Sequence, residues 1–296
     1  MGVQVVETPE ALRAVRRRLA GYIGAVYTMG ALHEGHLSLL NTAREENDAL
    51  IASIFINPTQ FAPGEDYANY PRTLERDLEL MDRAGVDVVF TPSPQDMYLP
   101  FHQTSVIVDE VSQGLEGASR PNHFRGVATV VAKLFNLTQP TTAYFGQKDA
   151  QQVVVIRRMV RDLNIPVEIA VCPTVREPDG LAMSSRNAYL KPDERKAAAS
   201  LYRALKAAAD AYDHGERDPS VLRMIACEEL YREPLAIVDY VAINHPHTLY
   251  GVHEPTDEPI LLSMAVKIGA PRLLDNCLLP YSLNNREHLT EILGVV

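Results

Sequence analysis

The feature that most constrains the fold is an alternation of short apolar runs with helical segments. The apolar runs predict buried strands at 23–27, 50–56 and 86–90, and the segments at 35–47 and 73–84 predict the helices that connect them. Strands that alternate with helices in this way favour a parallel α/β sheet. In such a sheet, ligands bind beyond the carboxyl ends of the strands.

The same alternation continues through the middle of the chain. The elements expected there are a helix at 124–137, a strand at 143–145, a helix at 149–162 and a strand at 167–171. Another helix is expected near the N-terminus, at 8–20, where Thr8 supplies a side-chain oxygen suited to cap its first turn.

After Asn187 the pattern changes. An Ala-rich helix is expected at 192–212, followed by short helices and by strands at 238–243 and 260–266. We therefore predict an α/β fold with a Rossmann-like parallel-sheet domain over 1–187 and a smaller C-terminal α+β domain over 188–296. The last ten or so residues are expected to be loosely held.

Composition excludes several classes of protein. The 296 residues carry a formal net charge of −10, which disfavours nucleic acid as the main partner. No run of about 18 apolar residues exists to span a membrane, and no signal peptide is recognisable, so we expect a soluble cytoplasmic protein. The three cysteines, at 172, 227 and 277, are far apart and indicate buried thiols in place of a disulfide framework or a zinc site.

Two histidines follow the first predicted strand. His33 and His36 fall on the first turn of the expected helix, where i and i+3 side chains share a face. Free N–H groups and a partial positive charge make a helix N-terminus a natural phosphate site. A metal-binding pair is the rival interpretation, although no third ligand is evident nearby, and two surface histidines without a function are a further alternative.

Two more polar segments follow later strands. Residues 146–149 combine a tight turn with Lys148, whose ammonium can neutralise a phosphate, and Asp149, which could equally cap the next helix. Residues 183–186 pair two hydroxyls with the guanidinium of Arg186, a set that suits pyrophosphate.

Two neutral amides follow predicted strand ends. Gln60 and Gln152 suit a small hydroxylated substrate that is held by hydrogen bonds, although surface polarity explains any single glutamine equally well.

Together these segments carry a resemblance. The His-x-Gly-His signature at 33–36 is similar to that of the nucleotidylyltransferase superfamily, and the longer strings resemble the pantothenate synthetase family in order and spacing from about residue 20 to 190. The strings are TMGALHEGH at 28–36, SIFINPTQF at 53–61, YPRT at 70–73, HFRGV at 123–127, FGQKD at 145–149 and GLAMSSRN at 180–187. Residues 238–241 and 273–276 are similar to the family more loosely.

The resemblance implies a set of site residues. Those implied for the ATP site are Met29, Gly30, Ala31, Leu32, His33, Glu34, Gly35, His36, Gly146, Gln147, Lys148, Asp149, Val175, Met183, Ser184, Ser185 and Arg186. Among them His36, His33, Lys148 and Arg186 are implied as catalytic. Gln60 and Gln152 are implied to bind pantoate, while Asn57, Glu116 and Arg120 match positions near the family's active site. No residue is assigned as a metal ligand.

The resemblance also implies an activity. It is the ATP-dependent condensation of pantoate with β-alanine to pantothenate through a pantoyl adenylate, releasing AMP and pyrophosphate, with Mg²⁺ as cofactor and a homodimer as the assembly. One departure is visible, because Tyr27 stands where the family usually has proline before Thr-Met-Gly. The rivals are a nucleotidylyltransferase that transfers AMP to a phosphate, and a nucleotide-binding protein without activity.

Overall fold

The computed structural model describes residues 2–294 and contains two sheets in that range. The larger sheet has the order β1-β4-β3-β2-β5-β6, and every neighbouring pair is parallel, which confirms the predicted α/β fold. Its strands are β1 (Gln4–Val6), β2 (Ile23–Thr28), β3 (Ala49–Ile54), β4 (Val88–Phe90), β5 (Thr142–Gly146) and β6 (Glu168–Cys172).

Helices cover both faces of this sheet because the central strands bury side chains on both sides. Ile23 and Ala25 of β2 join one core cluster, while Val26 beside them joins another. The long helices that contribute to the first cluster are α1 (Pro9–Arg16), α6 (His123–Thr138) and α7 (Ala150–Asp162), and those of the second are α2 (Glu34–Glu46) and α3 (Leu74–Arg83). Short helices lie at α4 (Pro94–Met97) and α5 (Glu116–Ser119).

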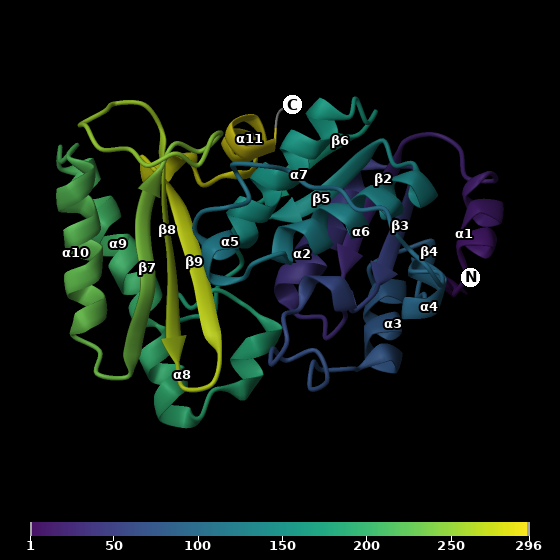
Figure 1. Cartoon of the computed structure of the whole chain (residues 1–296), viewed down its shortest axis with the longest axis horizontal. Coiled ribbons are helices and arrows are strands. Elements are labelled where there is room, and N and C mark those ends of the chain that lie inside the picture. Colours follow the sequence, from purple (N-terminus) through teal and green to yellow (C-terminus); the bar gives the residue numbers. More distant parts are fainter. Residues whose placement is uncertain (1, 295–296) are drawn as a thin grey trace.

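The second sheet is antiparallel and has its own core. Its strands are β7 (Ala236–Asn244), β8 (Ile260–Ile268) and β9 (Arg272–Leu279). They follow α8 (Pro192–Ala198), α9 (Ser200–Asp213) and α10 (Pro219–Tyr231). Figure 1 shows α9 and α10 on the outer side of this sheet, with the parallel sheet on its other side.

Several boundaries differ from the sequence prediction. The helix expected at 192–212 is interrupted at Ala199, whose N–H bonds to Lys196 three residues back and tightens that turn. The helix expected at 8–20 ends at Arg16, although Thr8 does cap it by accepting a hydrogen bond from the Ala11 N–H at 3.2 Å. Neither β1 nor β9 was expected as a strand.

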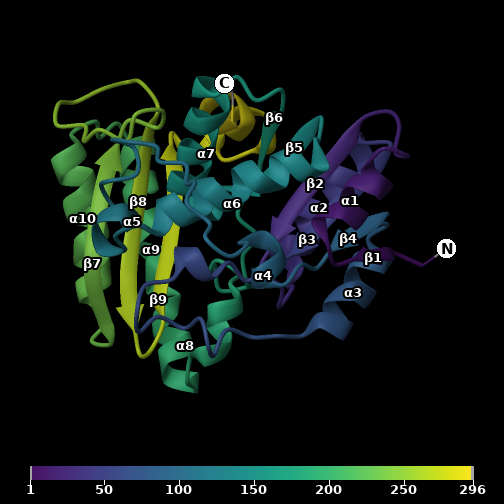
Figure 2. The same ribbon diagram turned by 45° about the vertical axis from the view of Figure 1, so that its right-hand side comes forward.

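The expectation of a loosely held C-terminus is wrong for residues up to 294. Leu289 and Leu293 are fully buried, and Thr290 Oγ1 accepts a hydrogen bond from the Val171 N–H of β6 at 3.0 Å. The segment forms α11 (Arg286–Leu289) and a π-helical turn (Thr290–Gly294), and Figure 2 places it beside α7 and β6. Residues 295–296 lie outside the described part.

Other expectations concern the chain as a whole. Cys172, Cys227 and Cys277 are free thiols; Cys172 and Cys277 are buried as expected, whereas Cys227 is only partly buried. Within residues 2–294, none of the helices combines the length and the apolar character that a bilayer crossing requires. The domain boundary after Asn187 falls between β6 and α8, and it stays a prediction, because the C-terminal segment returns to the parallel sheet.

Candidate active site

A cavity of about 880 Å³ opens at the carboxyl ends of the parallel strands, where the sheet topology predicts a ligand site. Tyr27 and Met29 line it at the end of β2, and Phe145 and Gly146 line it at the end of β5. Residues of β7, β8 and β9 line it from the other sheet, so the cavity lies between the two sheets.

His33 and His36 form the first turn of α2. His33 is the N-cap, and its Nδ1 accepts a hydrogen bond from the Gly35 N–H at 3.2 Å. His36 Nδ1 accepts the His33 N–H at 3.3 Å, and the two rings lie 4.1 Å apart between centroids. Since both Nδ1 atoms accept, a neutral ring carries its proton on Nε2. Both histidines line the cavity and have an Nε2–H with which to donate.

The surroundings keep both imidazoles neutral. Burial, reinforced by the nearby Lys148 ammonium, lowers the pKa of His33 to about 4. Burial also lowers the pKa of His36 to about 3, and the neighbouring His33 adds to this effect. These side chains therefore act as hydrogen-bond donors at neutral pH and carry no positive charge. Positive charge at this end of the cavity comes from Lys148.

The loop before α2 is held by a carboxylate that the sequence reasoning missed. Asp77 of α3 is 1% exposed, and its two oxygens accept the N–H groups of Ala31 and Leu32, each at 2.9 Å. Gly30 and Ala31 both have positive φ, so this turn needs such support. The acidic residue sits in a predicted helix, where its only signal was its type.

Gln60 is held by a short 3₁₀ helix (Pro58–Gln60) after β3. Its Nε2 donates to Met29 Sδ at 3.2 Å, and its Oε1 accepts from Asn57 Nδ2 at 3.1 Å. Asn57 is 1% exposed and also donates to the Gly126 carbonyl at 3.1 Å. Asn57 thus contacts Gln60 without lining the cavity itself.

Lys148 and Arg186 both line the cavity and come from different segments of the chain. Lys148 follows β5, and its nearest carboxylate is Asp149, with 3.8 Å between Nζ and Oδ1. Asp149 accepts no capping hydrogen bond from α7, so the alternative role considered for it is absent. Arg186 lies in a 3₁₀ helix (Ser185–Tyr189) and pairs with Asp66, at 3.0 Å between Nε and Oδ2.

Most of the predicted site residues meet at this cavity. Those that line it are Met29, His33, Gly35, His36, Gln60, Gly146, Lys148, Asp149, Gln152, Val175, Met183, Ser184, Ser185 and Arg186. Those that do not are Gly30, Ala31, Leu32, Glu34, Gln147 and Asn57. Gln147 is buried, and its side chain donates to Asn284 Oδ1 at 2.5 Å.

Several lining residues escaped the sequence analysis or were noted only by position. Glu65 and Asp66 come from the segment between the 3₁₀ helix and α3, and Tyr240 and Arg272 come from the second sheet. Arg272 binds both oxygens of Glu116, at 2.7 and 2.6 Å. Nothing local in the sequence marks Arg272, because its partner lies 156 residues away.

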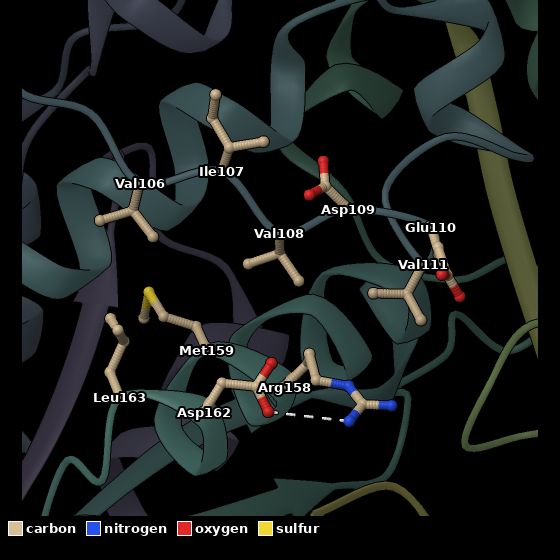
Figure 3. A pocket seen from close by; sticks show the side chains of 10 residues that line it. All are labelled: Val106, Ile107, Val108, Asp109, Glu110, Val111, Arg158, Met159, Asp162 and Leu163. Atoms are coloured by element: carbon tan, nitrogen blue, oxygen red, sulfur yellow. Dashed lines mark ion pairs between the residues drawn. The ribbon is translucent and has the colours of Figure 1, made fainter.

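A smaller cavity of about 370 Å³ lies elsewhere, between the extended segment 106–111 and the end of α7 (Figure 3). Its floor is apolar, and its charged lining consists of Asp109, Glu110 and Asp162 with one cation, Arg158. Arg158 itself pairs with Asp162 at 3.7 Å. An acidic lining repels phosphate, so this cavity is a poor nucleotide site.

The parallel sheet, the paired histidines at a helix N-terminus and the facing cations define an α/β nucleotide-binding enzyme. The model of the pantoate-beta-alanine ligase family matches residues 4–278. The chain belongs to this family. It is an enzyme, a carbon–nitrogen ligase that condenses pantoate with β-alanine at the expense of ATP.

Individual relatives are similar to this chain over almost its full length. A pantothenate synthetase of Chloroflexus aggregans is 58% identical over 94% of this chain and all of its own length. A crystal structure of pantothenate synthetase from Thermus thermophilus has a TM-score of 0.89 at 47% identity, covering 93% of this chain and 98% of its own. The Francisella tularensis pantoate-beta-alanine ligase, complexed with beta-gamma ATP and beta-alanine, has a TM-score of 0.76 at 36% identity, covering 94% and 98%.

Proposed function

We propose that the 880 Å³ cavity carries out this condensation in two steps. The pantoate carboxylate attacks the α-phosphorus of ATP, and pyrophosphate leaves, giving the pantoyl adenylate. The β-alanine amine then attacks the acyl carbonyl, loses a proton, and AMP leaves. The observation that supports this proposal is that one cavity is lined by the neutral pair His33 and His36, the cations Lys148 and Arg186, and the neutral amides Gln60 and Gln152. No protein nucleophile is needed, so the enzyme lowers the activation barrier by aligning the substrates and neutralising their charge.

The phosphate-binding part of this proposal rests on four side chains. Lys148 and Arg186 neutralise the charge on the leaving pyrophosphate. His33 and His36 donate from Nε2 at the N-terminus of α2, which favours anions. Because both rings are neutral, they add directed hydrogen bonds without attracting the pantoate carboxylate away from the phosphorus. Ser184 and Ser185 add hydroxyl donors to the lining of the same cavity.

The pantoate-binding part rests on Gln60 and Gln152. Both are uncharged amides that line the cavity, and they suit the hydroxyl groups of a small acid. Asn57 acts through Gln60, whose amide orientation it fixes. The Tyr27 ring packs 5.8 Å from that of Phe135, and its hydroxyl bonds to Thr138 Oγ1 at 2.7 Å. The ring is thus tied to α6, and we expect the proline-to-tyrosine departure to leave the phosphate sites unchanged.

Mg²⁺ fits this site as an ion held mainly by phosphate oxygens. No group of three His, Cys, Asp or Glu side chains between residues 2 and 294 is arranged to hold a metal. Asp149 is the carboxylate next to Lys148, with a side chain that is 48% exposed, and it can contribute one oxygen. The ion supplies charge neutralisation on the triphosphate when it is bound.

The cellular location and the oligomeric state are two further expectations. We propose a cytoplasmic homodimer in which residues 188–296 form the domain that covers the cleft. Ile107 and Leu163 line the smaller cavity and are exposed to 60% and 56%. The N–H groups of Ile107 and Val108 have no hydrogen-bond partner within residues 2–294. An extended segment of this kind can pair with a second copy. Light scattering should report twice the chain mass for the protein and a lower mass for Ile107→Lys.

The first test is a coupled assay for AMP with ATP, Mg²⁺ and pantoate, run with and without β-alanine. The proposal predicts AMP and pantothenate formation that depends on β-alanine. Pyrophosphate release without such dependence would favour a nucleotidylyltransferase with another acceptor. Nucleotide binding with no turnover would favour a protein that only binds ATP.

The second test addresses the cations. Lys148→Gln and Arg186→Ala should each lower the single-turnover rate of adenylate formation by about 10²–10³, by analogy with the loss of one oxyanion donor. Lys196→Gln removes the same charge from a side chain that is 83% exposed and outside the cavity, so it should leave the rate unchanged. An unaltered rate in Arg186→Ala would remove that residue from the first step.

A further inference from the structure

The segment between the 3₁₀ helix at 58–60 and α3 touches the phosphate side of the cavity through Arg186. Asp66 Oδ2 lies 3.0 Å from Arg186 Nε, and Asp66 Oδ1 lies 3.1 Å from Nη2. This is the two-bond geometry in which a guanidinium binds a carboxylate or a phosphate. Within residues 2–294, every hydrogen bond that the guanidinium makes goes to Asp66.

The neighbouring pair is built differently. Glu65 also binds an arginine of the cavity, Arg120, at 2.8 and 2.7 Å. Arg120 is held further by His123 Nε2 at 3.2 Å and by the Gln60 carbonyl at 3.4 Å. An arginine with several partners is fixed in place. Among the described residues, the Arg186 guanidinium has Asp66 as its one hydrogen-bond partner, so it can exchange Asp66 for an anion that binds more strongly.

The environment of Arg186 permits such an exchange. The side chains of Arg186 and Asp66 are 28% and 26% exposed, so both are hydrated if they separate. The segment stays attached through Tyr70, whose hydroxyl lies 3.0 Å from Ser185 Oγ and whose ring lies 5.8 Å from the guanidinium carbon. Asp66 can therefore release the arginine while the two loops remain together.

We propose that Asp66 is a positioning residue that occupies the anion-binding edge of Arg186 in the place of a nucleotide phosphate, and that the β- and γ-phosphates of ATP displace it. The inference rests on the proposed role of Arg186 in phosphate binding. ATP can bind Arg186 only after the Asp66–Arg186 ion pair breaks. Because breaking this pair costs free energy, Asp66 weakens the complex of the enzyme with ATP. It also recaptures Arg186 after adenylate formation, which speeds pyrophosphate release.

Titration of the full chain with three probes tests this exchange. Asp66→Asn should bind MgATP and pyrophosphate about three- to tenfold more tightly than the parent, because a partly exposed ion pair no longer competes. Binding of AMP, which lacks the β- and γ-phosphates, should not change. Asp66→Glu keeps the charge and should bind ATP within about twofold of the parent. Asp257→Asn, at a carboxylate that is 94% exposed, makes the same substitution outside the cavity and should change none of the three affinities.

Two further measurements separate exchange from a structural role. In an Arg186→Ala background, Asp66→Asn should no longer tighten ATP binding, since the two residues act through one interaction. In steady state, Asp66→Asn should lower both KM for ATP and kcat, because pyrophosphate leaves more slowly. The proposal would be overturned if Asp66→Asn melts like the parent but binds ATP equally tightly or more weakly. That result is expected if Asp66 instead bound Mg²⁺ or only shaped the loop. If Asp66→Asn fails to fold, Asp66→Ser is titrated in its place and must give the same tightening. A parent protein that binds no ATP would refute the proposed function itself.

Discussion

At the residue scale, the site depends on which groups are charged. The sequence places His33 and His36 together, but their hydrogen bonds and burial make them neutral donors, with pKa values of about 4 and 3. An unfolded histidine has a pKa near 6.5, so unfolding takes up protons below that pH. Because the folded pKa is depressed, the contribution to stability is complete above about pH 6.5 and is lost as the pH falls toward 4 and 3.

His36→Gln tests this linkage. Glutamine keeps an N–H donor but cannot be protonated, so the variant should lose less stability than the parent between pH 7 and pH 4. The slope of the unfolding free energy against pH should fall by up to one proton, about 1.4 kcal/mol per pH unit. Urea unfolding at several pH values measures it, with the exposed His253→Gln as control. Equal slopes in His36→Gln and the parent would show that folding does not lower the pKa of His36.

At the element scale, the position of Gln60 is set by the contact of α6 with the 3₁₀ helix at 58–60. A Cβ at Gly126 would lie 2.5 Å from the Thr59 carbonyl oxygen and 2.7 Å from the Gln60 nitrogen. Both are backbone atoms, which cannot rotate away. Gly126 is therefore required by the close approach of two backbones, although glycine lowers helix stability by about 1 kcal/mol relative to alanine.

Gly126→Ala should for this reason destabilise the protein despite its better helix propensity. We expect a loss of about 1–3 kcal/mol, typical of overpacking, and a raised KM for pantoate, because the 3₁₀ helix that carries Gln60 must move. Gly114→Ala is the matched control, since nothing lies within 4 Å of its Cβ position. Thermal unfolding and steady-state kinetics measure the two effects. A stabilised Gly126→Ala variant with normal kinetics would contradict the contact.

At the scale of the whole molecule, the two sheets are joined by polar contacts around the cavity. Arg176, after β6, binds Asp275 of β9 with 2.6 Å between Nη1 and Oδ2. Asn276 donates to the carbonyls of Gln147 and Lys148, at 3.0 and 2.9 Å. The strand that carries Asp275 and Asn276 is thus fixed to the backbone that presents Lys148.

Asp275→Asn should be one of the most destabilising single changes in the chain. The Asp275 side chain is 1% exposed and that of Arg176 is 16% exposed, so the substitution leaves a buried guanidinium without its counter-charge. We expect a loss of about 3–5 kcal/mol by chemical denaturation. Asp257→Asn, whose carboxylate is 94% exposed, should cost less than about 1 kcal/mol. Similar losses in both variants would mean that the buried pair does not hold the sheets together.

Part of the fold could be predicted from the sequence because the signals for it are local. Alternating apolar runs mark the central strands, and β1 was missed because it is three residues long and only partly buried. β9 is a long strand whose pairing is with β8, and its apolar residues at 273–274 and 277–279 are interrupted by Asp275 and Asn276, which are polar yet buried. The C-terminal segment looked free because its burial depends on β6, which is more than a hundred residues earlier in the sequence.

The sequence by itself determined the parallel α/β architecture and the family, and it supplied the residues that we propose to bind phosphate. Each of these depends on residue types at short spacing, such as the two histidines at a helix start. Only the tertiary structure decided the protonation of His33 and His36, the pairing of Arg186 with Asp66 and the closure of the cavity by Arg272. Those properties depend on burial and on partners far apart in the chain, which are created when the two sheets pack together.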